Sequence, residues 1–303
     1  SDFDVAINLS DLDGNNGFRL DGVSAYARLG LSVSNAGDVN GDGFDDVIVG
    51  AYGADPNNGE LSGSSYVVFG KASGFNATMN LSVLDGSNGF RLDGEAAGDM
   101  SGISVSNAGD VNGDGFDDVI VGAAGADPNG NSSGSSYVVF GKASGFSATL
   151  EFSSLDGSNG FRLDGVAWLD HSGFSVSSAG DVNGDGFDDL IVGADGADPN
   201  GYDSGSSYVV FGKASGFSAT MELFSLDGSS GFRLDGEAAG DRLGDSISNA
   251  GDVNGDGFDD LIVGAPGADP NGELSGSSYI IFGRSDFVSN VDFPGTAGDD
   301  ELT

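Results

Sequence analysis

The sequence predicts an all-β fold, a four-bladed β-propeller built from four-stranded blades. Three observations support this prediction. The chain repeats with a period of about 71 residues, so that Lys71, Lys142, Lys213 and Arg284 occupy equivalent positions. Each period holds short runs of β-branched and aromatic residues separated by turns rich in Gly, Asp and Asn. Four short antiparallel strands per repeat are typical of a propeller blade, whereas solenoid repeats are normally shorter.

The first repeat shows the order of the expected strands. Residues 31–36 and 47–50 form strands on either side of an acidic loop. The segment 53–57, Gly-Ala-Asp-Pro-Asn, is a turn that leads to a third strand at 65–69. The segment 89–92, which reads Gly-Phe-Arg-Leu, supplies the fourth strand. The same runs recur in the later repeats, so each repeat is expected to form one blade.

The two ends of the chain are in the same register, since Ser1-Asp2-Phe3 matches Ser285-Asp286-Phe287. The N-terminal piece therefore contributes only a fourth strand, Gly17–Leu20, and the last repeat lacks that strand. We expect residues 1–290 to form one closed ring in which the N-terminal strand completes the last blade, because closure removes open sheet edges. The alternatives are a fragment of a larger ring and a ring made by two chains.

The C-terminal tail, residues 291–303, is expected to be separate from the propeller. Gly295–Thr303 has no counterpart in the repeats. It resembles the opening of a hemolysin-type calcium-binding repeat rich in Gly and Asp. That resemblance implies that the natural chain continues and is exported from a bacterium.

Four identical acidic loops carry the strongest chemical signal in the sequence. Each reads D-x-N-x-D-G-x-x-D, at residues 38–46, 110–118, 181–189 and 252–260. Oxygen-bearing side chains stand at positions 1, 3, 5 and 9, and Gly at position 6 permits a sharp turn that frees the carbonyl of position 7. Oxygen ligands on a tight loop suit a hard cation, and their number suits Ca²⁺ better than Mg²⁺.

The sequence thus predicts about four calcium ions, one per blade. The predicted ligands are Asp38, Asn40, Asp42, Phe44 (carbonyl) and Asp46; Asp110, Asn112, Asp114, Phe116 (carbonyl) and Asp118; Asp181, Asn183, Asp185, Phe187 (carbonyl) and Asp189; and Asp252, Asn254, Asp256, Phe258 (carbonyl) and Asp260. An EF-hand is excluded, because position 12 is a Val inside an apolar strand and not a bidentate Glu. The Asp residues at position 8 (Asp45, Asp117, Asp188 and Asp259) are expected to point outward or to lie behind the ligands.

Composition narrows the partners further. The formal net charge is −38, from 48 acidic and 10 basic residues. Such a charge argues against nucleic acid and anionic membrane surfaces and favours cations. The chain has no Cys, no apolar run long enough to span a membrane and no signal peptide at Ser1. We expect no membrane insertion.

The loop and the strand after it, G-D-V-N-G-D-G-F-D-D-[VL]-I-V-G-A, resemble the FG-GAP repeat of integrin α-subunit propellers and related bacterial secreted proteins. The resemblance covers nearly all of residues 1–287. It implies calcium in β-hairpin loops on one face, ligand recognition on the other face or at the rim, and an extracellular or cell-surface location. The sequence departs from the family pattern in two respects. The name-giving Gly-Ala-Pro survives only at 264–266, and the Phe-Gly that precedes the loop is replaced by Leu-Gly at 29–30 and 243–244 and by Ser-Gly at 101–102 and 172–173.

Residues that follow the repeat and residues that break it suggest different roles. The ten basic residues fall at repeat-equivalent positions, which favours packing or ion pairs between blades. The residues that break the repeat are Tyr26, Arg28, Tyr52, Trp168, His171, Phe174 and Tyr202. Of these, Trp168 and His171 could form an aromatic recognition patch, or they could simply belong to a drifted surface loop.

The leading functional hypothesis is a calcium-binding structural, adhesion or interaction module of a larger secreted or surface protein, with an extracellular protein or glycan as its ligand. A glycan-binding lectin is the alternative. A polysaccharide-acting enzyme would require a non-repeated pair of acids, and no such pair stands out. No catalytic motif is present, so we expect no enzymatic activity.

Overall fold

The computed structural model describes residues 6–56 and 59–287. Its regular elements are almost all strands, which confirms the all-β prediction. None of the helices in these residues is long and apolar enough to cross a membrane. The predicted tail at 291–303 and the register of Phe3 lie outside the described residues.

Each repeat forms an antiparallel sheet of short strands, built outward from an inner strand. The inner strands are β2 (Val33–Gly37), β7 (Ser104–Gly109), β12 (Ser175–Gly180) and β17 (Ser246–Gly251). The second strands are β3 (Asp46–Ala51), β8 (Asp118–Ala123), β13 (Asp189–Ala194) and β18 (Asp260–Ala265). The third strands are β4 (Ser64–Val68), β9 (Ser135–Val139), β14 (Ser206–Val210) and β19 (Ser277–Ile281). The fourth strands are β6 (Gly89–Asp93), β11 (Gly160–Asp164) and β16 (Gly231–Asp235).

A fifth strand, which the sequence did not reveal, links neighbouring sheets. These strands are β5 (Thr78–Asn80), β10 (Thr149–Glu151) and β15 (Thr220–Glu222), and each pairs in parallel with the fourth strand of the preceding sheet. Each continues into a single 3₁₀ turn, η2 (Leu81–Val83), η3 (Phe152–Ser154) or η4 (Leu223–Ser225), while η1 (Leu9–Asp11) lies near the N-terminus. After its third strand the chain therefore visits the preceding sheet before returning to its own.

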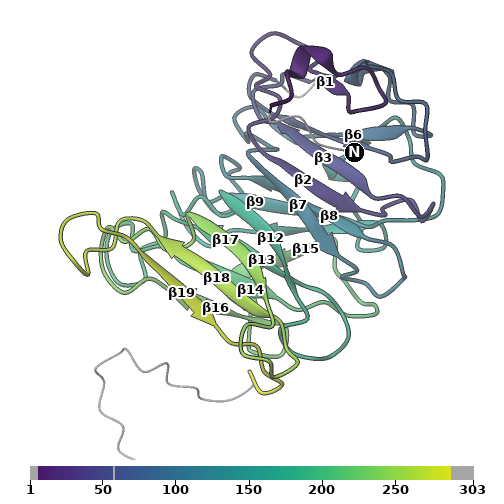
Figure 1. The fold of residues 1–303 in the computed structure, drawn as a ribbon. Coiled ribbons are helices and arrows are strands. Elements are labelled where there is room, and N and C mark those ends of the chain that lie inside the picture. The colour runs from purple at the N-terminus through teal and green to yellow at the C-terminus, as the bar shows by residue number, and fades with distance from the viewer. Residues whose placement is uncertain (1–5, 57–58, 288–303) are drawn as a thin grey trace, which may run out of the picture.

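The predicted closure by the N-terminal strand is wrong in this structure. Strand β1 (Arg19–Asp21) pairs in parallel with β5, with Arg19 opposite Thr78, and not with β19. Figure 1 shows why: the sheets follow one another in an arc, with β1 and β19 at opposite ends, so β1 cannot reach the last sheet. The period and the turn residues specify local pairing, but they do not specify how far each sheet turns relative to the next.

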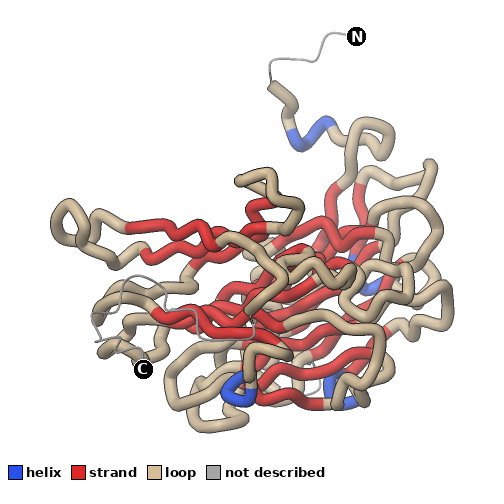
Figure 2. The backbone as a smooth tube through the Cα atoms, turned by 90° about the horizontal axis from the view of Figure 1, so that it is seen from below, coloured by secondary structure: helices blue, strands red, loops and turns tan. Residues whose placement is uncertain are grey.

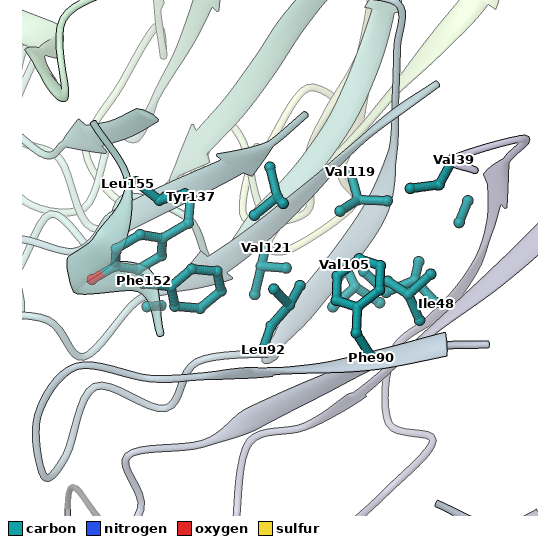
Figure 3. Packing of buried hydrophobic residues seen from close by; sticks show 14 of the residues in the cluster. Val39, Ile48, Phe90, Leu92, Val105, Val119, Val121, Tyr137, Phe152 and Leu155 are labelled. Atoms are coloured by element: carbon teal, nitrogen blue, oxygen red, sulfur yellow. The ribbon is translucent and has the colours of Figure 1, made fainter. Parts of the chain in front are cut away.

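The hydrophobic core lies between consecutive sheets and is not confined to any one of them. Figure 3 shows one such layer, in which Ile48 and Phe90 of one sheet meet Val105 and Val119 of the next. Ile48, Phe90 and Val119 are completely buried. Burying a side chain of this size stabilises the fold by about 1.5–3 kcal/mol, so contacts between repeats are a main source of stability.

Aromatic stacks join each sheet to the repeat that follows it. The rings of Phe90 and Phe146 stack with centroids 4.7 Å apart, and those of Phe161 and Phe217 stack at 4.6 Å. In each pair the first ring lies on a fourth strand and the second lies in the connection that leads to the next repeat's fifth strand. The recurring Phe residues are thus packing residues between repeats.

Candidate metal loops and the contacts between repeats

The four acidic loops occupy equivalent places, each joining the inner strand of a sheet to its second strand. They therefore lie together at one end of the strands, and Figure 2 shows the connections gathered at the two strand ends. The Gly at position 6 adopts a positive φ in every loop, from +87° at Gly43 to +94° at Gly257, as predicted. The Gly at position 4 does so too, at +70° in Gly41.

The loop side chains turn inward onto the backbone of their own loop. In the first loop, Asp38 accepts hydrogen bonds from the N–H of Asp42 at 3.0 Å and of Gly43 at 2.8 Å. Asn40 Oδ1 accepts from the same Asp42 N–H at 2.9 Å. Asp42 Oδ1 in turn accepts from the Phe44 N–H at 3.0 Å. Positions 1, 3 and 5 are thus brought together in one small turn, as the motif predicts.

The Asp at position 9 lies beneath the loop, and it is completely buried in all four repeats. In the second repeat, Asp118 accepts a hydrogen bond from the Val111 N–H at 3.0 Å and another from the Gly141 N–H at 2.9 Å. This carboxylate therefore fastens the loop to the end of the third strand. Among the described residues, no Lys or Arg side chain forms an ion pair with Asp46, Asp118, Asp189 or Asp260.

Burial raises the pKa of Asp118 and of Asp189 to about 8, and that of Asp46 to about 6. The two backbone donors lower the pKa again, and the neighbouring carboxylates at positions 1 and 5 raise it. A buried carboxylate beside two others is costly unless a positive charge lies close to it. The donor set of the loop is all oxygen, so a hard cation such as Ca²⁺ fits this chemistry.

The side chains are not, however, arranged as a finished coordination shell. Within residues 6–56 and 59–287, no three His, Cys, Asp or Glu side chains are grouped so that they could hold an ion. In each loop the carboxylates accept backbone N–H groups, as described above. The ligand roles assigned from the sequence therefore stay predictions.

In the later repeats the Asp at position 8 lies behind a predicted ligand residue, which is the second of the two places expected for it, but that ligand residue belongs to the preceding loop. The carboxylate of Asp117 accepts a hydrogen bond from the backbone N–H of Asp38 in the preceding repeat, at 2.7 Å. Asp259 does the same for Asp181 at 3.0 Å. Since these carboxylates face the neighbouring loop and not solvent, position 8 is a latch between repeats.

The Phe at position 7 also contacts the preceding loop through its side chain. The rings of Phe116, Phe187 and Phe258 lie against the position 4 Gly of the repeat before, so that a Cβ added at Gly41, Gly113 or Gly184 would overlap the ring. The sequence assigned only the carbonyl of this residue a role. The recurrence of Gly at position 4 of every loop is the sequence feature that could have indicated this ring contact.

The recurring basic residues form pairs mostly within one strand. Arg91 pairs with Asp93 at 2.7 Å, and Arg162 pairs with Asp164 at 2.8 Å. Arg162 also reaches Glu95 of the preceding repeat at 3.0 Å. The predicted ion pairs between blades therefore occur at Arg162 and at Arg242, which pairs with Asp195 of the preceding repeat, whereas Arg91 pairs within its own strand. Lys142 lies over the Phe146 ring, 4.9 Å from its centroid.

Residues that break the repeat lie at the other end of the strands, in the connections opposite the acidic loops. Trp168 is 64% exposed and Tyr202 is 72% exposed. His171 faces the buried Asp195, with 3.6 Å between Nδ1 and Oδ1, and Arg242 binds the same carboxylate at 2.9 Å. Among the described residues, no ring stacking joins Trp168 to His171, and the recognition patch stays a prediction.

Backbone strain is concentrated at this second end. Within the described part of the chain, ten non-Gly residues have a positive φ, and all ten lie in these connections. Several are paired across repeats: the N–H of Met100 donates to the carbonyl of Leu61, and that of His171 donates to the carbonyl of Ser132. Such conformations cost roughly 1–3 kcal/mol each and persist only where the surrounding structure enforces them. This end is therefore rigidly held.

Comparison with known proteins identifies the repeats. The FG-GAP repeat matches residues 29–68, 101–139, 172–210 and 243–281, which together are more than half of the chain. Integrin alpha-V of Gallus gallus is 29% identical over 252 residues, which cover 80% of this chain and 20% of the relative. Integrin alpha-PS5 of Drosophila melanogaster is 34% identical over 177 residues, covering 58% of this chain and 16% of the relative. The chain spans about a fifth or less of the length of these relatives.

Proposed function

The chain belongs to the FG-GAP repeat family, and from this premise we propose that it is a calcium-stabilised interaction module of a larger extracellular or cell-surface protein. The similarity to integrin α chains supports a binding role and not a catalytic one. The whole of such a protein would extend well beyond this chain, because the relatives are several times longer.

One observation carries the calcium part of the proposal. Four loops of identical sequence each cover a buried carboxylate that has no basic partner among the described residues. Asp38, Asn40, Asp42 and Asp46 and their equivalents would supply the ligands, with the Phe44 carbonyl as a further donor. A bound Ca²⁺ would neutralise the cluster and bind the folded state far better than the unfolded chain. The four ions are then clamps on the repeats.

Calorimetry of the chain with Ca²⁺ and with a calcium chelator tests this role. We expect the melting temperature to fall on chelation, because a ligand bound 100-fold above its Kd stabilises by about 2.7 kcal/mol per site. Titration calorimetry should give about four ions per chain. An unchanged melting temperature and no binding heat would refute the calcium role. Asp114→Asn, with Asp245→Asn outside the loops as control, should remove one ion of the four.

The recognition surface is proposed at the end opposite the acidic loops. There most of the residues that break the repeat, Trp168 and Tyr202 among them, are exposed on a backbone held by contacts between repeats. A rigid, blade-specific surface suits binding of an extracellular protein, since little ordering entropy is lost on association. Binding of candidate extracellular proteins to the surface-immobilised chain tests where the partner binds. Trp168→Ala should weaken this binding if the partner contacts the proposed surface.

A glycan ligand is the second candidate, and the exposure of Trp168 and Tyr202 favours it. Aromatic side chains with free ring faces offer an apolar body and a polar tip to a sugar. A glycan array probed in Ca²⁺ should then give hits. Trp168→Ala should weaken these hits, whereas Val83→Ala, a substitution outside the connections that carry Trp168, should leave them unchanged. An array without hits would count against a glycan ligand and would favour the hypothesis of a protein ligand.

A further inference from the structure

The first sheet has an uncovered apolar face. Val33 is 63% exposed, whereas the equivalent Val105 and Val176 are 4% and 6% exposed. Val47 is also exposed, whereas its equivalent Val119 is completely buried. The interior residues are covered by the sheet that precedes them. We call Val33, Val47, Phe44, Asp45 and the free edge of β1 the N-terminal face.

The last sheet has the opposite face uncovered. Ile280 is 44% exposed, whereas the equivalent Val209 is completely buried. Val253 is exposed at 58%, whereas the equivalent Val182 is completely buried. In the interior this face is covered by the sheet that follows. We call Val253, Gly255, Ile262, Ile280 and the free edge of β19 the C-terminal face.

The hydrogen bonds that join neighbouring acidic loops leave one acceptor unused in the first loop and one donor unused in the last loop. Asp117, Asp188 and Asp259 each accept from the loop before them, so the equivalent Asp45 has no preceding loop to bind. The Asp252 N–H is the equivalent donor at the other end. Similarly, Gly255 has nothing within 4 Å of an added Cβ, where its three equivalents meet a Phe ring. Phe44 is the equivalent ring, and it is exposed.

The strand edges complement one another as well. Among the described residues, β19 pairs only with β18, and β1 pairs only with β5. In each earlier repeat the third strand pairs with a Gly-Phe-Arg-Leu-Asp strand, such that Tyr208 lies opposite Arg233. Residues 17–21 have that same sequence. Pairing β19 with β1 in this register would place Tyr279 opposite Arg19.

A hollow of about 380 Å³ on the last sheet marks a further point of contact. It is lined by Ser246, Gly264, Pro266 and neighbouring residues. In the interior, the equivalent Gly193 is approached so closely by the Gly244 carbonyl that a Cβ would overlap it. At Gly264 an added Cβ would meet only Ser246 among the described residues, and Gly30 carries the equivalent carbonyl.

From these five complementary features we propose that the N-terminal face of one copy of this chain docks on the C-terminal face of a second copy. The contact would reproduce the interface that the chain already forms three times between its own repeats. It would bury Val33 and Ile280, join Asp45 to the Asp252 N–H, and extend the last sheet with β1. A head-to-tail contact of this kind gives a closed ring if its rotation closes and an open array if it does not.

The net charge of the chain sets a condition on this association. At −38 per copy, two chains repel each other at long range. Salt screens this repulsion, with a Debye length of about 8 Å at physiological ionic strength. The apolar and backbone contacts of the faces are unaffected, so association strengthens as salt is added.

Sedimentation of the 303-residue chain at fixed Ca²⁺, over a dilution series of about 1 µM to 1 mM, tests the proposal. We expect a mass of at least twice that of the monomer at high concentration, and more association at higher salt. Val33→Arg blocks the N-terminal face, and Ile280→Arg blocks the C-terminal face. Each variant alone should stay monomeric. Mixed in equal amounts they should form a dimer, because each keeps the face that the other has lost.

Val83→Arg, an exposed position outside both faces, is the control and should associate like the unmodified chain. Circular dichroism and melting curves establish that the variants remain folded. Self-association of Val33→Arg alone would overturn the head-to-tail arrangement. A monomeric unmodified chain at every concentration and salt would show that a second copy is not the occupant, and that the faces belong to flanking repeats of a longer chain or to another partner.

Discussion

The side-chain carboxylate of Asp188 accepts a hydrogen bond from the backbone N–H of Asp110, 2.8 Å away and 78 residues earlier in the chain. The bond joins two acidic loops of neighbouring repeats. Replacing Asp188 with Ala leaves the Asp110 N–H without its partner at a half-buried site. We expect a loss of about 1–3 kcal/mol in unfolding free energy, measured by urea denaturation at constant Ca²⁺.

Asp45→Ala is the matched control, because Asp45 holds the same position in the first loop with no loop before it. At concentrations where the chain is monomeric, this variant should be as stable as the unmodified chain. Equal losses for both variants would show that the latch contributes nothing.

The Gly at position 4 offers a second test of packing between repeats. A Cβ at Gly184 would overlap the Phe258 ring, whereas nothing lies within 4 Å of one at Gly255. Both have φ close to +77°, at +75° and +79°. Gly255→Ala should therefore cost only the backbone strain, about 1–2 kcal/mol. Gly184→Ala should cost a further 1 kcal/mol or more by rough comparison with overpacked cores. Thermal melts measure the difference. Equal melting temperatures for the two variants would contradict the contact between Gly184 and the Phe258 ring.

The aromatic stacks should dominate stability. The Phe161 ring is completely buried and stacks on Phe217. Phe161→Ala should lower the unfolding free energy by about 3–5 kcal/mol, since it removes apolar contacts and leaves a cavity between two repeats. The exposed Phe224 is the control, and Phe224→Ala should change stability by less than about 0.5 kcal/mol. Calorimetric melts of both variants measure the difference.

The pair of His171 and Asp195 should make stability depend on pH. The Asp195 carboxylate, with Oδ1 3.6 Å from Nδ1, raises the pKa of His171, and Asp203 raises it further, whereas burial and Arg242 lower it. Since the folded pKa exceeds the unfolded one, the contribution is complete below about pH 6.5 and is lost as pH rises through the folded pKa. Because the side chain is partly exposed, the effect should stay below about 1 kcal/mol.

The pH effect is measured by comparing the melting temperature of His171→Met with that of the unmodified chain between pH 5 and 8.5. Met is the residue that the second repeat carries at this position, as Met100. The deficit of the variant should shrink as pH rises. Arg242→Met removes the charge that lowers the pKa of His171, so in this variant the loss of the His171 contribution should move to higher pH. A pH-independent deficit for His171→Met would refute the ion pair.

Much of the local structure was predictable from the sequence, because it depends on residues close together in the chain. The four main strands of a repeat follow from apolar runs bounded by Gly and Asp, and the turn at Gly43 follows from its motif. The fifth strand was not predictable. Thr78–Asn80 is too short for a hydrophobic pattern, and its partner is a strand of another sheet.

The contacts between repeats also could not be predicted from the sequence pattern. Asp117 reads as an exposed acid in its own loop, and its role appears only when the preceding loop lies beside it. The closure of the ring failed for the same reason, since the rotation from sheet to sheet depends on packing over many side chains.

The exchange of strands between sheets means that the unit which repeats in the sequence is not the unit which folds into a sheet. A cut at a sheet boundary would split a repeat, whereas removal of one whole period, such as residues 110–180, would join equivalent points of two loops. The first sheet would still receive a strand from the repeat that follows it, because β15 would take the place of β10 beside β6. Genes for such chains can therefore gain or lose repeats by unequal recombination without creating an interface that the protein does not already possess.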